Sequence, residues 1–337
     1  MKMRKRIKKG STWFLALTVF MSAMVISDVN AANGIEIDKK CSITFELSGD
    51  LDKEFSELKD LEVPVKLYQV ADVTVSGTYN SLEEYKGLDL EKVDSDTTAA
   101  QWEEMAKKAQ EIVAEKEKEP TAEIVIEKGE GVAENLKTGM YLVAAEEVLS
   151  TGYAYQFTPF LISLPNNYYA TSENDDWVYD VTTSLKPEKE SRLGSLMIDK
   201  TLKSFNATLG NATFVFQIEA QLDGEHVYSD MVSMVFDAAG TKSLTVSGIP
   251  AGAQVTVTEV YSGASYDLTT AASQNVTIVA DSEEEPGANA VHAAFTNTYN
   301  GGMNGNASVV NHFTVNDEGI WDVEQQFGDT EAQEYGR

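Results

Sequence analysis

The stretch GSLMIDKTL, residues 194–202, alternates apolar and polar positions in the manner of a β-strand. Successive side chains of a strand point to opposite faces, so Lys200 is expected on the same face as Leu196, Ile198 and Leu202. An unpaired charge on a buried face costs several kcal/mol, and ionisable groups in such places are therefore paired or neutral. The rest of the chain has to supply partners for this amine.

Two further polar residues stand on apolar strand faces. Glu259 shares its face with Val255 and Val257, and Asn297 shares its face with Phe295. The three polar side chains are therefore expected to meet in one core. Burial lowers the pKa of a lysine and raises the pKa of a carboxylic acid, which favours a neutral amine beside a protonated acid.

A neutral lysine amine next to an asparagine side-chain amide could react with it. Lys200 would attack the side-chain carbonyl of Asn297, while Glu259 would hydrogen-bond that carbonyl and transfer protons as general acid and base. The product would be an isopeptide bond between the first and last strands, and ammonia would be released. The alternative is a salt bridge between Lys200 and Glu259, with Asn297 capping a turn.

The N-terminus is typical of an exported protein. Basic residues MKMRKRIKKG precede an apolar run, and Val29-Asn30-Ala31 ends it with a small residue, so residues 1–31 are predicted to be a signal peptide. No membrane span is expected after cleavage. The net charge of −28 argues against nucleic acid or an anionic membrane as partner. A single cysteine, Cys41, excludes a disulfide within the chain and is predicted to be a small buried hydrophobe.

The remaining chain is predicted to form two β-rich domains and a tail. Residues 32–188 contain short strand-like runs and one helix, residues 98–118, whose apolar stripe should pack on a sheet. A charged, Pro-containing joint, KPEKESRLG, leads to a second series of strands, so residues 189–300 form an all-β sandwich. Residues 301–337 are predicted to be a Gly/Asn-rich linker and a short tail, with room for one hairpin.

The second domain resembles a known family. GSLMIDKTL, then GIPAGAQVTVTEV, then AAFTNTY look like the lysine, glutamate and asparagine segments of CnaB-type domains of Gram-positive surface proteins. The resemblance implies that the isopeptide bond forms spontaneously from Lys200, Glu259 and Asn297. The fold class expected for the chain is all-β: two tandem Ig-like, CnaB-type antiparallel sandwiches, the first with an inserted α-helix.

The first domain resembles the N-terminal domain of Gram-positive shaft pilins. VPVKLYQVADV, TGMYLV, FTPFLISLP and WVYDVTTSLK are similar to pilin segments in the same order. In those pilins a lysine nine residues after a tryptophan is joined to the next subunit by a sortase. Trp177 and Lys186 have that spacing, although Pro187 departs from the family pattern. The resemblance implies polymerisation through Lys186, with other pilin subunits or a sortase as partners. Lys186 is expected to face water.

The C-terminal residues, GDTEAQEYGR, contain no Leu-Pro-x-Thr-Gly signal and no apolar span. An ordinary shaft subunit is therefore not expected. Three alternatives remain open: an acceptor at one end of a fibre, a non-covalent accessory subunit, and the product of a truncated gene. In each case the chain is expected in the cell wall, in a pilus or secreted.

Other chemistry finds less support in the sequence. His226, His292 and His312 are scattered without metal-ligand spacing, so no metal or cofactor is expected. A second cross-link is conceivable in the first domain, with Lys39 as the amine and Glu146 or Glu147 as the acid, but no Asn falls clearly on an apolar face of the closing strand. We expect no enzyme beyond the single self-directed reaction.

The rival hypothesis for function is a secreted carbohydrate-binding module or a glycoside hydrolase accessory domain. Its sugar would stack on exposed aromatic side chains such as Tyr168, Tyr169 and Trp177. No pair of carboxylates stands out for hydrolysis.

Overall fold

The structure is a computed structural model, and several parts of the chain lie outside its described residues. The signal peptide predicted at residues 1–31 lies outside them, as do Tyr168 and Tyr169. The described residues are 34–47, 53–94, 96–167, 177–263, 265–282, 285, 287–302, 309–316 and 319–327.

The chain divides into two compact units. The first comprises the described residues up to Val148 together with Gln156–Glu188, and the second comprises Leu149–Tyr155 and the described residues from Lys189 onward. The short segment Leu149–Tyr155 thus groups with the second unit although it lies within the first stretch of sequence.

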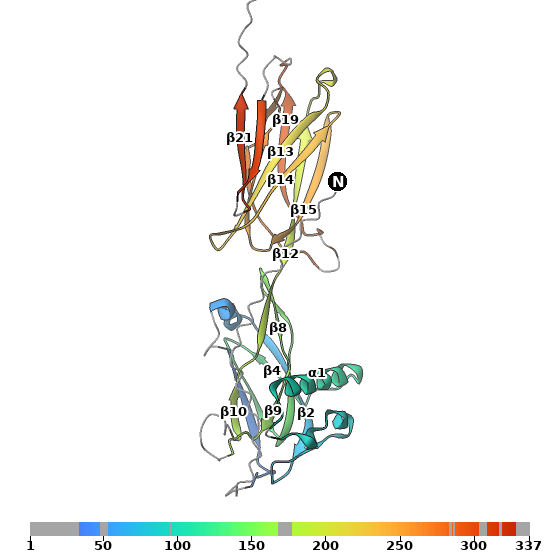
Figure 1. Ribbon diagram of the computed structural model, residues 1–337, viewed down its shortest axis with the longest axis vertical. Helices are drawn as coiled ribbons and strands as arrows, with labels where there is room; N and C mark the ends of the chain where they lie inside the picture. Colours follow the sequence, from blue (N-terminus) through green and yellow to red (C-terminus); the bar gives the residue numbers. More distant parts are fainter. Residues whose placement is uncertain are drawn as a thin grey trace, which may run out of the picture. The chain divides into compact units, whose positions relative to one another are not determined.

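The first unit contains two sheets (Figure 1). One has the order β3-β2-β6-β9, with β4 also paired to β2, and the other has the order β10-β1-β5. Strands β1 and β10 run parallel, whereas the other pairs in these two sheets are antiparallel. The strands are β1 (Cys41–Glu46), β2 (Val63–Val73), β3 (Tyr79–Ser81), β4 (Ala122–Ile126), β5 (Glu130–Leu136), β6 (Gly139–Ala145), β9 (Phe160–Leu164) and β10 (Asp180–Thr183).

Three 3₁₀ helices and one α-helix accompany these sheets. The 3₁₀ helices are η1 (Lys53–Asp60), η2 (Glu83–Leu88) and η3 (Leu90–Lys92), and helix α1 is Ala99–Glu115. Helix α1 begins after Thr98, whose side chain accepts from the Gln101 backbone while the Gln101 side chain accepts from the Thr98 backbone. It ends before the predicted residue 118, because Glu117 has a left-handed φ of 47°.

The apolar stripe of α1 packs on the first core, as the sequence predicts. Trp102, Met105, Ala106 and Ala109 contact a cluster of buried side chains. That cluster includes Tyr68, Val70, Met140 and Leu142 of strands β2 and β6. Cys41 is 2% exposed, in agreement with its predicted role. Burial, followed by the nearby Asp180 carboxylate, raises the pKa of its thiol to about 11.

The joint predicted between the two strand series contains a strand. Residues Pro187–Ser191 form strand β11, which joins β8 (Tyr153–Phe157) and β7 (Val148–Leu149) in a three-stranded sheet. The Lys189 ammonium lies 3.7 Å from the centroid of the Tyr153 ring, a cation–π contact that favours an ordered strand. The charged composition of this stretch thus reflects a solvated strand.

The second unit is a sandwich of two four-stranded sheets, ordered β15-β12-β19-β17 and β14-β13-β16-β18. Its strands confirm the all-β prediction, with one refinement: β12 and β19 pair in parallel. Among the described residues between its first and last sandwich strands, the only other regular element is the 3₁₀ helix η4 (Ala207–Leu209). The strands are β12 (Leu193–Leu202), β13 (Ala212–Leu222), β14 (Glu225–Phe236), β15 (Gly240–Pro250), β16 (Gln254–Tyr261), β17 (Tyr266–Leu268), β18 (Ser273–Thr277) and β19 (Val291–Tyr299).

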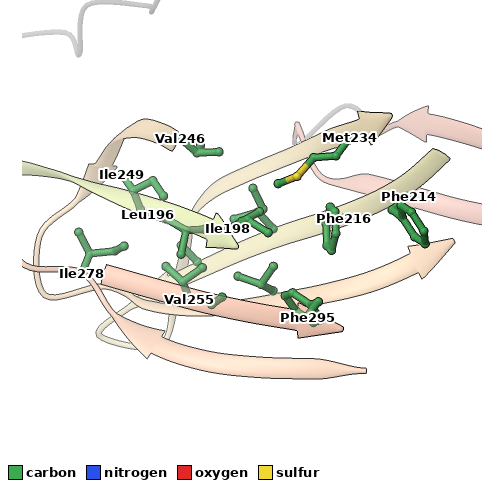
Figure 2. Close-up of a cluster of buried hydrophobic side chains, with 14 of the residues drawn as sticks. Leu196, Ile198, Phe214, Phe216, Met234, Val246, Ile249, Val255, Ile278 and Phe295 are labelled. Carbon is green, nitrogen blue, oxygen red and sulfur yellow. The ribbon is translucent and has the colours of Figure 1, made fainter. Parts of the chain in front are cut away.

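Local sequence explains how these strands connect and pack. Asp223 and Gly224 have positive φ values of 54° and 83° and form the two-residue hairpin turn between β13 and β14. The inward-facing side chains of both sheets interdigitate in one core, whose centre includes Ile198, Phe216 and Phe295 (Figure 2).

A final hairpin follows the sandwich. Strands β20 (Val309–Val315) and β21 (Trp321–Phe327) pair with each other in antiparallel register. The Gln217 side chain donates to the Trp321 carbonyl at 3.1 Å, and the Trp321 backbone N–H donates to Ser229 Oγ at 3.3 Å. The hairpin thus contacts β13 and β14. Within the described residues, no helix has the length and apolar character needed to cross a membrane.

The start of β12 allows a direct test of this packing. A Cβ on Gly194 would lie 2.0 Å from the Val279 carbonyl oxygen, so Gly194→Ala is expected to lower the free energy of unfolding by about 1–3 kcal/mol. Denaturant titration measures this change. At Gly87 an added Cβ meets only the flexible end of Lys108, at 3.7 Å, so Gly87→Ala is the tolerated control. Equal stability of the two variants would contradict the observed packing.

Candidate functional site

The three polar residues singled out in the sequence lie together in the core of the second unit. Lys200 is on β12 and Asn297 is on β19, in the same sheet, while Glu259 is on β16 of the facing sheet. In the parallel register of β12 and β19, Lys200 lies opposite Phe295 and Leu202 lies opposite Asn297. Lys200 and Asn297 are therefore diagonal neighbours, within reach of each other on one face.

Their polar atoms form a closed triangle. Lys200 Nζ donates to Glu259 Oε2 at 2.5 Å and also to Asn297 Oδ1. Asn297 Nδ2 donates to Glu259 Oε1 at 2.8 Å. Lys200 and Asn297 are 0% exposed and Glu259 is 8% exposed, so the network satisfies the buried groups with one another.

Aromatic rings surround the amine and keep the site apolar. Lys200 Nζ lies 4.2 Å from the centroid of the Phe214 ring and 5.6 Å from that of Phe216. The Phe216 and Phe295 rings are themselves 5.2 Å apart. The regular alternation of the segment TFVFQIEAQL places Phe214 and Phe216 on the inner face of β13. Phe214 and Phe216 are not among the site residues predicted from the sequence, although this alternation is a signal that could have identified them.

Burial changes the proton affinity of the amine. Desolvation is the largest effect on Lys200 and lowers its pKa from the ordinary value, while the hydrogen bond and charge of Glu259 act in the opposite direction. The net lowering increases the fraction of neutral amine at a given pH. A neutral amine has the free electron pair that an attack on an amide carbon requires.

The geometry differs from the expectation in one respect. Glu259 was expected to hydrogen-bond the Asn297 carbonyl, but its carboxylate accepts from the amide nitrogen instead. The lysine ammonium can only donate hydrogen bonds, so the amide oxygen, an acceptor, faces it. The amide nitrogen, a donor, then faces the carboxylate. One carboxylate thus contacts both the lysine amine and the amide nitrogen.

Lys186 lies elsewhere, in the first unit, and the expectation that it faces water is wrong. The residue is half-buried, and its Nζ lies 5.8 Å from the centroid of the Phe160 ring. Burial lowers the pKa of this amine, opposed in part by the charge of Glu103 on helix α1. Strand β10 ends at Thr183, so the alternation seen in the sequence does not extend to Lys186.

The other candidates from the sequence do not assemble. Lys39 is exposed and contacts Glu36 at 3.9 Å and the Tyr179 ring at 4.0 Å, whereas Glu146 pairs with Lys66 at 2.6 Å. These separate pairs give no support to a second cross-link. The indole of Trp177, which the rival hypothesis needs in solvent, is partly buried against the first core.

Potential metal ligands do not form a cluster in the part of the chain that the structure describes. Among the described residues, no group of three or more His, Cys, Asp or Glu side chains is arranged to hold a metal ion. His292 Nδ1 contacts Asp199 at 2.6 Å on the exposed face of the β12–β19 sheet.

Comparison with known proteins gives one family match and several structural likenesses. Residues 196–300 match a family described as a domain of unknown function (DUF5979), which covers less than half of the chain. No curated protein matches the chain.

Several of the solved structures that resemble the chain are pilins of Gram-positive bacteria. A streptococcal ancillary pilin is 12% identical with a TM-score of 0.26, and the match covers 82% of this chain and 72% of that one. The major pilin SpaD from Corynebacterium diphtheriae is 11% identical, with a TM-score of 0.27 and 80% and 99% coverage. The basal pilin SpaE from Lactobacillus rhamnosus GG is 12% identical, with a TM-score of 0.30 and 73% and 87% coverage. At such TM-scores, function has to be argued from the site.

Proposed function

We propose that this chain is a secreted cell-surface structural protein, a pilus-associated subunit or adhesin, stabilised by an intramolecular isopeptide bond between Lys200 and Asn297. The observation that carries the proposal is the closed triangle of amine, acid and amide in an apolar core. In this arrangement Glu259 is the general acid and base.

The reaction follows from the contacts. Glu259 Oε2 takes a proton from the Lys200 ammonium, which leaves a neutral amine. Nζ then forms a bond to Asn297 Cγ. The protonated carboxyl group of Glu259, which already contacts Nδ2, turns to present its proton to Nδ2, and the Cγ–Nδ2 bond breaks. Ammonia leaves, and Glu259 takes up the extra proton of the new amide nitrogen. The residues react once, without turnover of an external substrate.

The proposed bond has a mechanical meaning. Strands β12 and β19 are the first and last strands of the sandwich, and they are parallel neighbours. A force on the two ends of the domain would shear this pair, whose backbone hydrogen bonds would otherwise have to resist it alone. A covalent link between the strands bears that load directly. The single cysteine of the chain offers no disulfide for the same purpose.

The pilus assignment rests on the sequence resemblance of both domains, together with the predicted signal peptide. Lys186 is the proposed attachment point for another pilin subunit through a sortase. Its burial supports this role, because an amine with a lowered pKa has a larger neutral fraction near pH 7. The rival carbohydrate-binding hypothesis has less support, because Trp177 is partly buried against the first core.

Intact mass tests the cross-link. The protein is expected to weigh one ammonia less than its sequence, whereas Glu259→Gln should have the full mass because proton transfer is lost. Trypsin should release residues 193–203 joined to residues 243–337, since Lys200 is no longer cleavable. Glu219→Gln, on the outer face of β13, is the matched control and should keep the mass deficit. A full-mass wild type would refute the proposed bond.

Stability tests its mechanical contribution. Asn297→Ala removes the acceptor but keeps the pair of Lys200 and Glu259. Because the link closes a loop of 97 residues, the variant should lose about 4–5 kcal/mol of unfolding free energy. Guanidinium titrations of the two proteins measure the difference. Equal midpoints for the linked and unlinked proteins would count against a stabilising role.

The pH dependence of acetylation tests Lys186. A lysine reacts as the neutral amine, so a lowered pKa should shift the midpoint of its acetylation profile to lower pH than that of the exposed Lys128. Peptide mass spectrometry after brief acetylation across a pH series gives both midpoints, and comparing midpoints removes differences in access. A midpoint for Lys186 at or above that of Lys128 would oppose its assignment as an activated nucleophile.

A further inference from the structure

The last strand of the sandwich has one edge that is only partly covered by another strand. Strand β19 pairs with β12 along most of its length, but it pairs with β17 only from Asn297 to Tyr299. The preceding part of this edge would present unpaired backbone groups, which are usually protected in folded proteins. Side chains and a loop close it instead.

Gln274 closes the edge at Ala294. Its Oε1 accepts from the Ala294 backbone N–H at 3.1 Å, and its Nε2 donates to the Ala294 carbonyl. The side-chain amide thus makes both hydrogen bonds that a neighbouring strand would make. At Thr296, two residues further on, the N–H donates to Thr270 Oγ1 at 3.3 Å and the carbonyl accepts from the Thr269 N–H at 2.8 Å.

Gln274 belongs to the opposite sheet, the one that carries the acid. Strand β18 pairs with β16, and Gln274 lies opposite Val257 in this register. Just before β18, the Ala272 carbonyl accepts from the Glu259 N–H at 2.9 Å. One short segment therefore binds the strand of Glu259 through its backbone and the strand of Asn297 through a side chain.

From this connection we infer that Gln274 is a positioning residue for the cross-linking reaction, an inference that rests on the function proposed above. Apolar packing between two sheets is non-directional and permits small sliding movements. The paired hydrogen bonds to Ala294 fix β19 relative to the sheet of Glu259, three residues before the reacting Asn297. Misplacement of reacting groups by about 1 Å can slow a reaction roughly 100-fold.

The rate of cross-linking tests the inference. The full chain is made by cell-free synthesis, stopped in acid at intervals, and analysed for the linked tryptic product. Gln274→Ala is expected to form the link at least roughly tenfold more slowly than wild type. Without the hydrogen bonds to Ala294, β19 would be held less firmly relative to Glu259. Asn275→Ala is the matched control: its amide lies on the outer face of the same strand, where it accepts from Thr256 at 2.8 Å, and its rate should be unchanged.

A second variant separates positioning from general stability. Gln274→Glu keeps an acceptor for the Ala294 N–H but cannot donate to the Ala294 carbonyl until the carboxylate is protonated. Its rate relative to wild type should therefore recover as pH falls, which weakened packing alone would not produce. The folded state is checked in the unlinkable Asn297→Ala background, where adding Gln274→Ala should leave the protein folded at the assay temperature.

The outcomes distinguish the two proposals. Linking of Gln274→Ala at the wild-type rate would overturn the role of Gln274 and leave the isopeptide proposal intact. The role of Gln274 would also be overturned if Gln274→Ala links slowly and, when added to Asn297→Ala, leaves the protein unfolded at the assay temperature. Absence of the linked product from wild type would instead remove the isopeptide proposal, and the positioning role with it.

Discussion

The second unit depends on a single physical constraint: three polar side chains occupy an apolar core from which water is excluded. Each would destabilise the fold if it were alone, because a buried charge or amide without a partner costs several kcal/mol. Lys200, Glu259 and Asn297 satisfy one another only when both sheets are in their observed register. The network thus specifies how β12, β16 and β19 align, beyond what the surrounding phenylalanines require.

The sequence contains enough information to place these three residues in one core. Alternation along a strand identifies the face of each side chain, and the structure has all three on inward faces. Alternation does not identify which strands are neighbours or in which direction they run. The parallel pairing of β12 with β19 and the contact of Glu259 with the amide nitrogen therefore came from the structure.

Other features were missed because their sequence signals resemble those of ordinary surface residues. Gln274 is one of many polar residues in short strands, and a side-chain bond across two sheets has no periodic pattern. Strand β11 is not visible in the sequence, because its charges and proline are equally typical of a joint between domains. Lys186 follows the end of β10, so the alternation of side chains along that strand does not indicate which way Lys186 faces.

If the chain is exported and cross-linked as proposed, the distance along the chain between Lys200 and Asn297 has a consequence for export. Lys200 is in the first strand of the sandwich, and Asn297 follows it by 97 residues, in the last. The amide would then not meet the amine until almost the whole domain had left the export channel and folded. Such a chain would remain linear, and could be threaded, throughout its passage. It would become a closed ring only on the far side, where the fold itself would determine when the link forms.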